Sequence, residues 1–263
     1  MWFEWGGYLL LGAFAGVVAG LLGVGGGLII VPVLVYIFSQ QGFAPEVIVH
    51  LAVGTSLATI IFTSIASMRA HHQHGAVQWH VFRQLAPGIV LGTFIGAALA
   101  DVMSSTVLRS FFGVFELVVA AQMAINAKPA PHRQLPGLAG TSLAGMGIGT
   151  LSAIVGIGGG TMTVPFMAWC NVAMQKAVAT SAAVGLPIAL AGATGYVFTG
   201  WNETGLPDYA FGYVYWPALA GIVIMSMLTA PLGAKLAHKL PAAKLKRIFA
   251  LLLAVLGVRM LLG

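Results

Sequence analysis

Long runs of apolar residues, separated by short polar stretches, dominate the pattern of this 263-residue chain. The runs cover residues 8–38, 47–68, 84–100, 107–126, 137–170, 177–199, 212–234 and 247–262. An α-helix needs about 20 residues to cross roughly 30 Å of hydrocarbon, and six of the eight runs fit a single crossing. The first and fifth would be helices of roughly 45–50 Å, which is too long for one crossing. The pattern predicts an all-α polytopic membrane protein in which these two runs are interrupted.

Both long runs carry a glycine cluster, and the two clusters match. At a shift of 133 positions, the segment Gly12–Pro32 (GAFAGVVAGLLGVGGGLIIVP) aligns with the segment Gly145–Pro165 (GMGIGTLSAIVGIGGGTMTVP). Each glycine costs a helix about 1 kcal/mol, so we expect each run to break there and return as a hairpin of two shorter helices. The matched prolines Pro32 and Pro165 are expected at the start of the returning helix, where proline is tolerated.

The distribution of charge tests the hairpin prediction. If the two long runs double back, Lys and Arg gather on one side of the membrane, and only Arg109 and Arg259 fall on the other. All acidic residues except Glu116 then join those two. Because basic loops remain in the cytoplasm, the pattern predicts a multi-pass membrane protein with both termini in the periplasm.

The number of membrane passes in each half predicts internal symmetry. Each half contains a glycine-broken hairpin and three further helices, an odd number of passes, so the second half enters from the opposite side. We therefore expect two inverted-topology repeats, 1–126 and 137–263, joined by a cytoplasmic linker at 127–136. Gly96 also aligns with Gly233 at a shift of 137. Interrupted helices at corresponding positions of two halves indicate a transporter's substrate site.

Composition supports the membrane assignment. The chain is 59% hydrophobic and 7% charged, with a mean hydropathy of +0.96, whereas soluble proteins carry about 25% charged residues. The lone Cys170 excludes a disulfide framework within the chain.

Other motifs argue against a cofactor, a metal or a nucleic-acid partner. A dinucleotide fingerprint needs a third glycine where this chain has Leu28 or Thr161. The run of His71, His72 and His74 lacks Cys or acidic partners and is expected to be a solvated basic surface. We also find no nucleophile that would indicate an enzyme or any catalytic residue.

The glycine clusters have three possible roles. They can let helices pack closely, as the Gly12, Gly16 and Gly20 ridge does; they can form bare turns; or they can bind an anion through the N–H groups that open the returning helix. Unwound backbone at membrane depth must face protein or a water-filled cavity, which favours the anion site.

Hydroxyl side chains supply further candidate donors. At a shift of 125, the Thr55–Ser56 pair aligns with the Thr180–Ser181 pair. Thr55, Thr59, Thr63 and Ser67 recur every four residues on one helical face, although such hydroxyls can also bond their own backbone. The candidate substrate-binding residues are Gly23, Gly25, Gly26, Gly27, Thr55, Ser56, Thr59, Gly156, Gly158, Gly159, Gly160, Thr161, Thr180 and Ser181.

Glu116 is the one acidic residue inside an apolar run. Ionisable residues within a membrane are functional candidates by default, so Glu116 is a candidate carrier of a coupling proton. A structural pair with Arg109 is the alternative.

The doubled G-[VI]-G-G-G motif, followed four residues on by V-P, resembles the TauE/SafE sulfite exporter family, also called the toluene-sulfonate uptake permease family. The resemblance covers both halves and implies transport of sulfur-containing anions such as sulfite, sulfoacetate and related organosulfonates across the bacterial inner membrane. The inside-negative potential favours anion export by about 2.3 kcal/mol per 100 mV, so we expect export. A passive anion channel, or a carrier of a non-sulfur organic anion, is the alternative.

Overall fold

The computed structural model describes residues 2–22, 26–125, 134–237 and 242–263. The helices are α1 (Trp2–Leu22), α2 (Gly27–Gln40), α3 (Ile48–Gln73), α4 (Trp79–Asp101), α5 (Ser105–Ala124), α6 (Leu138–Val155), α7 (Gly160–Trp169), α8 (Met174–Thr199), α9 (Trp216–Ala237) and α10 (Ala242–Leu262). Strands β1 (Ala210–Phe211) and β2 (Val214–Tyr215) form a small antiparallel hairpin before α9.

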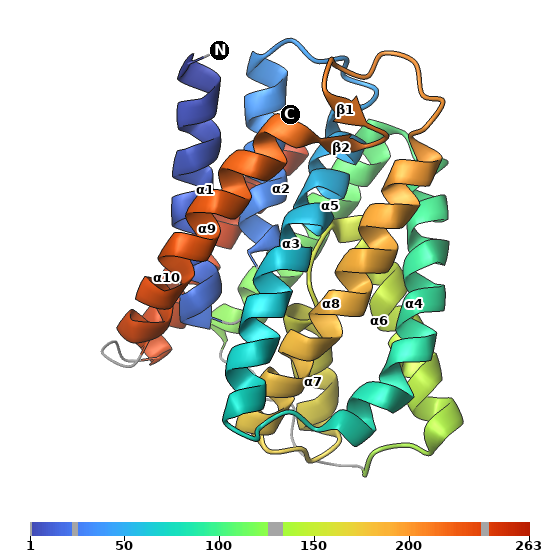
Figure 1. Ribbon diagram of the computed structural model, residues 1–263, viewed down its shortest axis with the longest axis vertical. Helices are drawn as coiled ribbons and strands as arrows, with labels where there is room; N and C mark the ends of the chain where they lie inside the picture. The colour runs from blue at the N-terminus through green and yellow to red at the C-terminus, as the bar shows by residue number, and fades with distance from the viewer. Residues whose placement is uncertain (1, 23–25, 126–133, 238–241) are drawn as a thin grey trace.

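The prediction of an all-α polytopic membrane protein is confirmed. Helices α3, α4, α5, α6, α8 and α9 are long and apolar enough to cross a membrane. The helices run along the long axis of the molecule, and the β-hairpin is confined to one end of it (Figure 1).

The two long apolar runs are broken at the glycine clusters, as the sequence predicts. The first run forms α1 and α2, and the second forms α6 and α7. Gly26, before α2, has φ 78°, and Gly156, after α6, has φ 71°. These left-handed conformations favour glycine because a Cβ would be strained there. Glycine is therefore favoured where α2 begins and where α6 ends, although these two positions are not equivalent, because Gly26 aligns with Gly159, which has φ −61°.

The two prolines lie further into the returning helices than expected. Pro32 lies inside α2 and Pro165 inside α7, each in the second turn rather than at the start. Proline has no N–H to offer the carbonyl four residues earlier, here that of Leu28 and that of Thr161. The first turn of each returning helix therefore lacks one of its usual hydrogen bonds.

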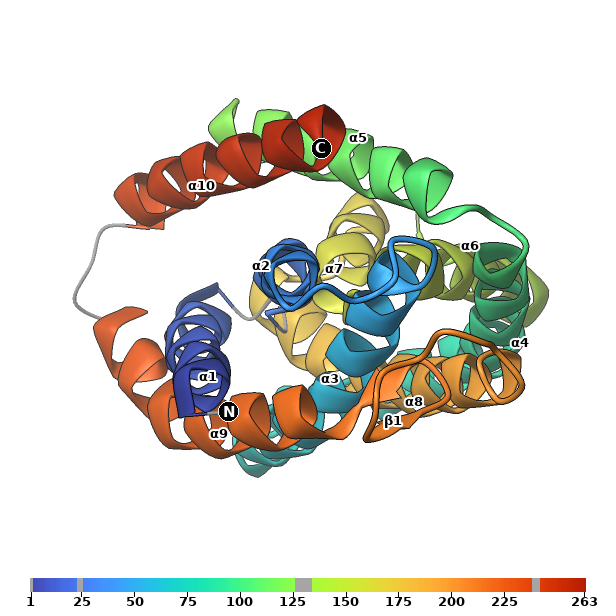
Figure 2. The same ribbon diagram turned by 90° about the horizontal axis from the view of Figure 1, so that it is seen from above.

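The helices associate in pairs. Helix α1 packs along α9, α6 along α4, α5 along α10 and α3 along α8. The view from above shows α5 and α10 along one side of the molecule, with the short helices α2 and α7 between them and the rest of the bundle (Figure 2). The side chains of Val31, Leu34 and Leu51 are completely buried, so α2 and α3 belong to the core.

The two halves make matching contacts. A Cβ at Gly12 would lie 2.6 Å from the carbonyl oxygen of Ile222, and one at Gly145 would lie 2.6 Å from that of Leu85. Gly145 aligns with Gly12 at the shift of 133, and Ile222 aligns with Leu85 at the shift of 137. The α1–α9 pair of one half therefore has the same contact register as the α6–α4 pair of the other.

Basic and acidic residues separate toward opposite ends of the bundle. The end of α3 and the starts of α4 and α8 lie at the lower end in Figure 1, and they carry Arg69, Arg83 and Lys176. The upper end holds both termini, the start of α3 and the end of α4, with Glu46 and Asp101 beside these helix ends. This arrangement agrees with the hairpin topology deduced from charge.

Replacing Gly96 or Gly233 by valine should destabilise the protein. An added Cβ would collide with the carbonyl oxygen of Thr150 in the first case and of Val17 in the second, which forces the paired helices apart. Overpacking of this kind costs about 1–3 kcal/mol, and we expect a lower unfolding temperature in detergent by scanning fluorimetry. Gly147→Val is the matched control because no heavy atom lies within 4 Å of its added Cβ. An equal loss in the control would contradict the close-packing role.

Candidate functional site

The two helix breaks touch each other inside the bundle. A Cβ at Gly27, the first residue of α2, would lie 2.5 Å from the carbonyl oxygen of Gly156 and 3.0 Å from the Cα of Ile157. Ser56 on α3 donates a hydrogen bond of 2.9 Å from its hydroxyl to the same Gly156 carbonyl. The unwound backbone after α6 is therefore satisfied by protein at this point, as a site remote from water requires.

The second break also brings the start of α7 against α8. A Cβ at Gly159 would lie 2.7 Å from the carbonyl oxygen of Ser181 and 3.1 Å from the backbone nitrogen of Gly185. The amides of Gly160 and Thr161 open α7, and the first amides of a helix have no carbonyl partner within it. Glycine at position 159 thus allows a helix N-terminus to lie directly beside α8.

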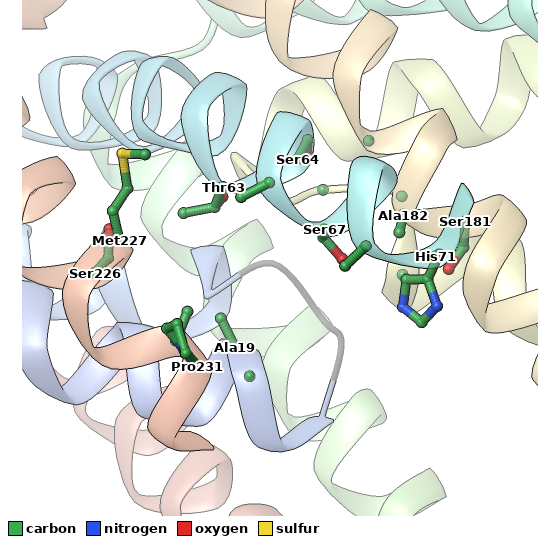
Figure 3. A pocket seen from close by; sticks show the side chains of 18 of the residues that line it. Ala19, Thr63, Ser64, Ser67, His71, Ser181, Ala182, Ser226, Met227 and Pro231 are labelled. Atoms are coloured by element: carbon green, nitrogen blue, oxygen red, sulfur yellow. The ribbon is translucent and has the colours of Figure 1, made fainter. Parts of the chain in front are cut away.

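A cavity of about 590 Å³ adjoins this second break. Its lining comes from α1, α3, α8 and α9 together with the glycines that precede and open α7 (Figure 3). The polar lining consists of Thr63, Ser64, Ser67, His71, His74, Ser181 and Ser226, with the backbone of Gly158, Gly159 and Gly160. Since His71 and His74 belong to the last turn and the cap of α3, the cavity extends toward the lower end of the molecule in Figure 1.

The cavity lining is mostly apolar, and none of its described polar side chains is permanently charged. Among the described residues that line it there is no Lys, Arg, Asp or Glu. Hydroxyls can donate hydrogen bonds, and helix N-termini favour negative charge through the helix dipole. A site of this kind can hold an anion with neutral donors and can also release it.

The structure brings part of the predicted site to this cavity. Gly158, Gly159, Gly160 and Ser181 line it. The predicted residues Gly26, Gly27, Thr55, Ser56, Thr59, Gly156, Thr161 and Thr180 do not line it. Gly23 and Gly25 lie outside the described residues.

The duplicated threonines bind the polypeptide itself. The Thr55 hydroxyl accepts a hydrogen bond of 2.9 Å from the backbone N–H of Tyr215, before α9. The Thr180 hydroxyl accepts one of 2.9 Å from the backbone N–H of Gln78, before α4. These equivalent bonds anchor equivalent connections in the two halves, which gives the duplicated threonines a structural role.

Two other predicted residues have different surroundings. Thr59 donates from its hydroxyl to the carbonyl of Ser56, 2.7 Å away in the same helix. The Thr161 hydroxyl is buried in the first turn of α7 and has no hydrogen-bond partner. Thr161 is therefore an unpaired predicted hydroxyl at this helix terminus, although it does not line the cavity.

Sequence reasoning missed His71 and His74 as members of the site. They were expected to be a solvated surface, and His74 is indeed exposed, but both line the cavity. The four-residue spacing of the hydroxyls on α3 runs on from Ser67 to His71, and this spacing was the signal that could have found it. Nowhere in the described ranges do three His, Cys, Asp or Glu side chains cluster as a metal site requires.

Glu116 stands apart from the cavity. Its side chain is completely buried on α5, and neither carboxyl oxygen has a hydrogen-bond partner. The Arg109 Nε is also buried without a partner, so the described residues show no ion pair between the two. An unpaired carboxylate is costly in an apolar interior, which leaves Glu116 as a position where a proton can be held.

Comparison with known proteins identifies the family. The model of the sulfite exporter TauE/SafE family matches residues 8–260. A probable membrane transporter protein of Haemophilus influenzae is 36% identical over 97% of both chains. One of Methanocaldococcus jannaschii is 29% identical over 97% of this chain and 94% of its own length. No solved structure matches the chain.

The long apolar helices, the duplicated glycine breaks and the cavity beside one of them are all features of a multi-pass membrane transporter. Together with the family match along almost the whole chain, they show that the protein belongs to the sulfite exporter TauE/SafE family.

Proposed function

We propose that the protein is a bacterial inner-membrane secondary transporter that exports sulfur-containing oxyanions such as sulfite, sulfoacetate or related organosulfonates. The observation that carries the proposal is the cavity that joins the N-terminus of α7 to hydroxyl side chains, with no permanently charged group among its described lining residues. The family description supports transport and the sulfur-anion class, and the relatives' names support membrane transport.

The proposed donors suit the chemistry of this substrate class. A sulfonate stays ionised at cellular pH, so the site cannot neutralise it by protonation and must supply donors. In our proposal the amides that open α7 and the hydroxyls of Ser64 and Ser67 on α3 donate to the anion. The Ser181 hydroxyl lies beside them and donates to the Val178 carbonyl, 2.8 Å away. A helix terminus contributes about 0.3–1 kcal/mol toward a bound charge. Weak donors of this kind allow the release that a carrier needs.

We also propose that residues 1–126 and 137–263 are inverted repeats joined by 127–136, with both termini in the periplasm. The matching contact registers of the α1–α9 and α6–α4 pairs support the repeat. The collection of basic residues at the end opposite the termini supports the sidedness. With this orientation the described cavity faces the cytoplasm.

A coupled proton would be carried by Glu116. Export of an anion is favoured by the membrane potential, at about 2.3 kcal/mol per charge and 100 mV, and needs no coupling on electrical grounds. The buried and unpaired carboxyl of Glu116 nevertheless supplies a proton site within α5. Proton coupling would make the rate of export depend on pH.

Gly158→Ala should weaken anion binding without disturbing the fold. The added methyl would lie 3.4 Å from Cγ2 of Ile60, with no other contact within 4 Å, so it fits but takes up space beside the anion. We expect at least about a tenfold loss of affinity for sulfite or sulfoacetate, or about 1.4 kcal/mol, by titration calorimetry. Gly147→Ala, on the exposed face of α6, is the control. Wild-type affinity in Gly158→Ala would place the site elsewhere.

Sided labelling tests the proposed topology. In a variant with Cys170 replaced by alanine, cysteines are introduced singly at Asp208, exposed in the loop between α8 and β1, and at Gln73, exposed at the end of α3. A membrane-impermeant maleimide added to intact cells should label position 208 and should reach position 73 only after permeabilisation. Labelling of both from the same side would refute the arrangement.

Glu116→Gln tests proton coupling. Because Glu116 does not line the cavity, we expect anion binding to be retained while the pH dependence of flux into vesicles disappears. Glu46→Gln, which changes an exposed acid before α3, should keep the wild-type pH profile. A Glu116→Gln profile identical to wild type would instead assign Glu116 a structural role.

A further inference from the structure

The repeat defines a counterpart for every residue that lines the cavity. At the shifts found in the sequence, the cavity residues Ala19, Gly20, His71, His74 and Ala230 correspond to a second set of positions. That set is Ser152, Ala153, Tyr196, Thr199 and Thr93. This second set lies on the paired helices α6 and α4 and on α8, which correspond to α1, α9 and α3.

The counterpart region is closed. Tyr196 donates a hydrogen bond of 3.1 Å from its hydroxyl to the carbonyl oxygen of Ala153. The counterparts of these two residues, His71 and Gly20, both line the cavity in the other half. One turn earlier on α8, a Cβ at Gly192 would lie 2.9 Å from Cδ1 of Leu57, so Leu57 fills the space there. Helix α8 is therefore packed against α6 and α3, whereas the equivalent surfaces in the other half enclose the cavity.

Three hydroxyl groups in the closed region lack hydrogen bonds. The side-chain oxygens of Thr93, Ser152 and Thr199 are buried without a partner, and the side chains of Thr93 and Ser152 are completely buried. Their counterparts Ala230, Ala19 and His74 all line the cavity. Buried polar groups without partners are few in native proteins, and each requires a reason. Exposure to water and substrate in another conformation supplies that reason.

We infer that Thr93, Ser152 and Thr199 line a second access path, which leads from the helix breaks toward the end of the molecule that holds both termini and is closed here by Tyr196 and Leu57. The inference rests on the proposed inverted repeats and transport function. The described cavity and the second path are then the two access routes to the same helix breaks. Tyr196 holds this path closed, because its hydroxyl on α8 donates a hydrogen bond to the backbone of α6.

The test uses Thr93→Cys and Ser152→Cys reporters in a Cys170→Ala variant that retains transport. An impermeant thiosulfonate reagent is applied to intact cells, with and without Tyr196→Phe. Loss of one hydrogen bond shifts an equilibrium by about 2- to 13-fold, so Tyr196→Phe should raise the labelling rate of both reporters by this factor. A Ser226→Cys reporter in the described cavity, labelled in inside-out vesicles, should react more slowly in the same variant.

Ala120→Cys is the control for a general loss of helix packing in Tyr196→Phe. Ala120 is buried on α5, away from both access paths. Its labelling should not change in Tyr196→Phe. The inference is overturned if Thr93→Cys and Ser152→Cys remain unlabelled in Tyr196→Phe, or if they react from the same side as Ser226→Cys. The labelling requires no sulfur substrate, so a failure to bind sulfite would refute the proposed substrate while leaving this result interpretable.

Discussion

The contact between the two helix breaks is the constraint on which the rest of the structure depends. Backbone that leaves a helix within a bilayer must find its hydrogen bonds inside the protein. Here Gly27 lies against Gly156, and Ser56 donates to the Gly156 carbonyl. Glycine is needed at the break because the left-handed backbone of Gly156 and the close approach at Gly27 leave no room for a Cβ. The interrupted helices are thus held together by main-chain contacts.

The surrounding helices hold this contact by close packing of small residues. The hydrophobic effect gives little reason for helices to associate in lipid, so van der Waals contact between closely approaching backbones takes its place. Gly12 and Gly145 supply this contact in equivalent pairs, α1 with α9 and α6 with α4. Each pair packs tightly within itself, and each meets one of the two central helices, α3 or α8, at its own side of the molecule.

The two halves differ in how their helix pairs pack against α3 and α8. Ala19 and Gly20 leave space beside α3, whereas Ser152 and Ala153 are covered by α8 and held by Tyr196. Two nearly equivalent arrangements of one repeated sequence are therefore present together, one open and one closed. Three buried hydroxyls without partners, those of Thr93, Ser152 and Thr199, lie in the closed region.

The sequence by itself determined the helical class, the broken segments and the side of the molecule on which basic residues gather, because these follow from local hydropathy, glycine and charge. It also determined the correspondence between halves, which the contacts of Gly96 and Gly233 reproduce. Only the tertiary structure decided the roles of the duplicated hydroxyls: Thr55 and Thr180 bind loop amides from distant parts of the chain, while His71 joins the cavity. Sequence spacing reports which residues share a helical face, but the neighbour that this face meets depends on how separate helices pack.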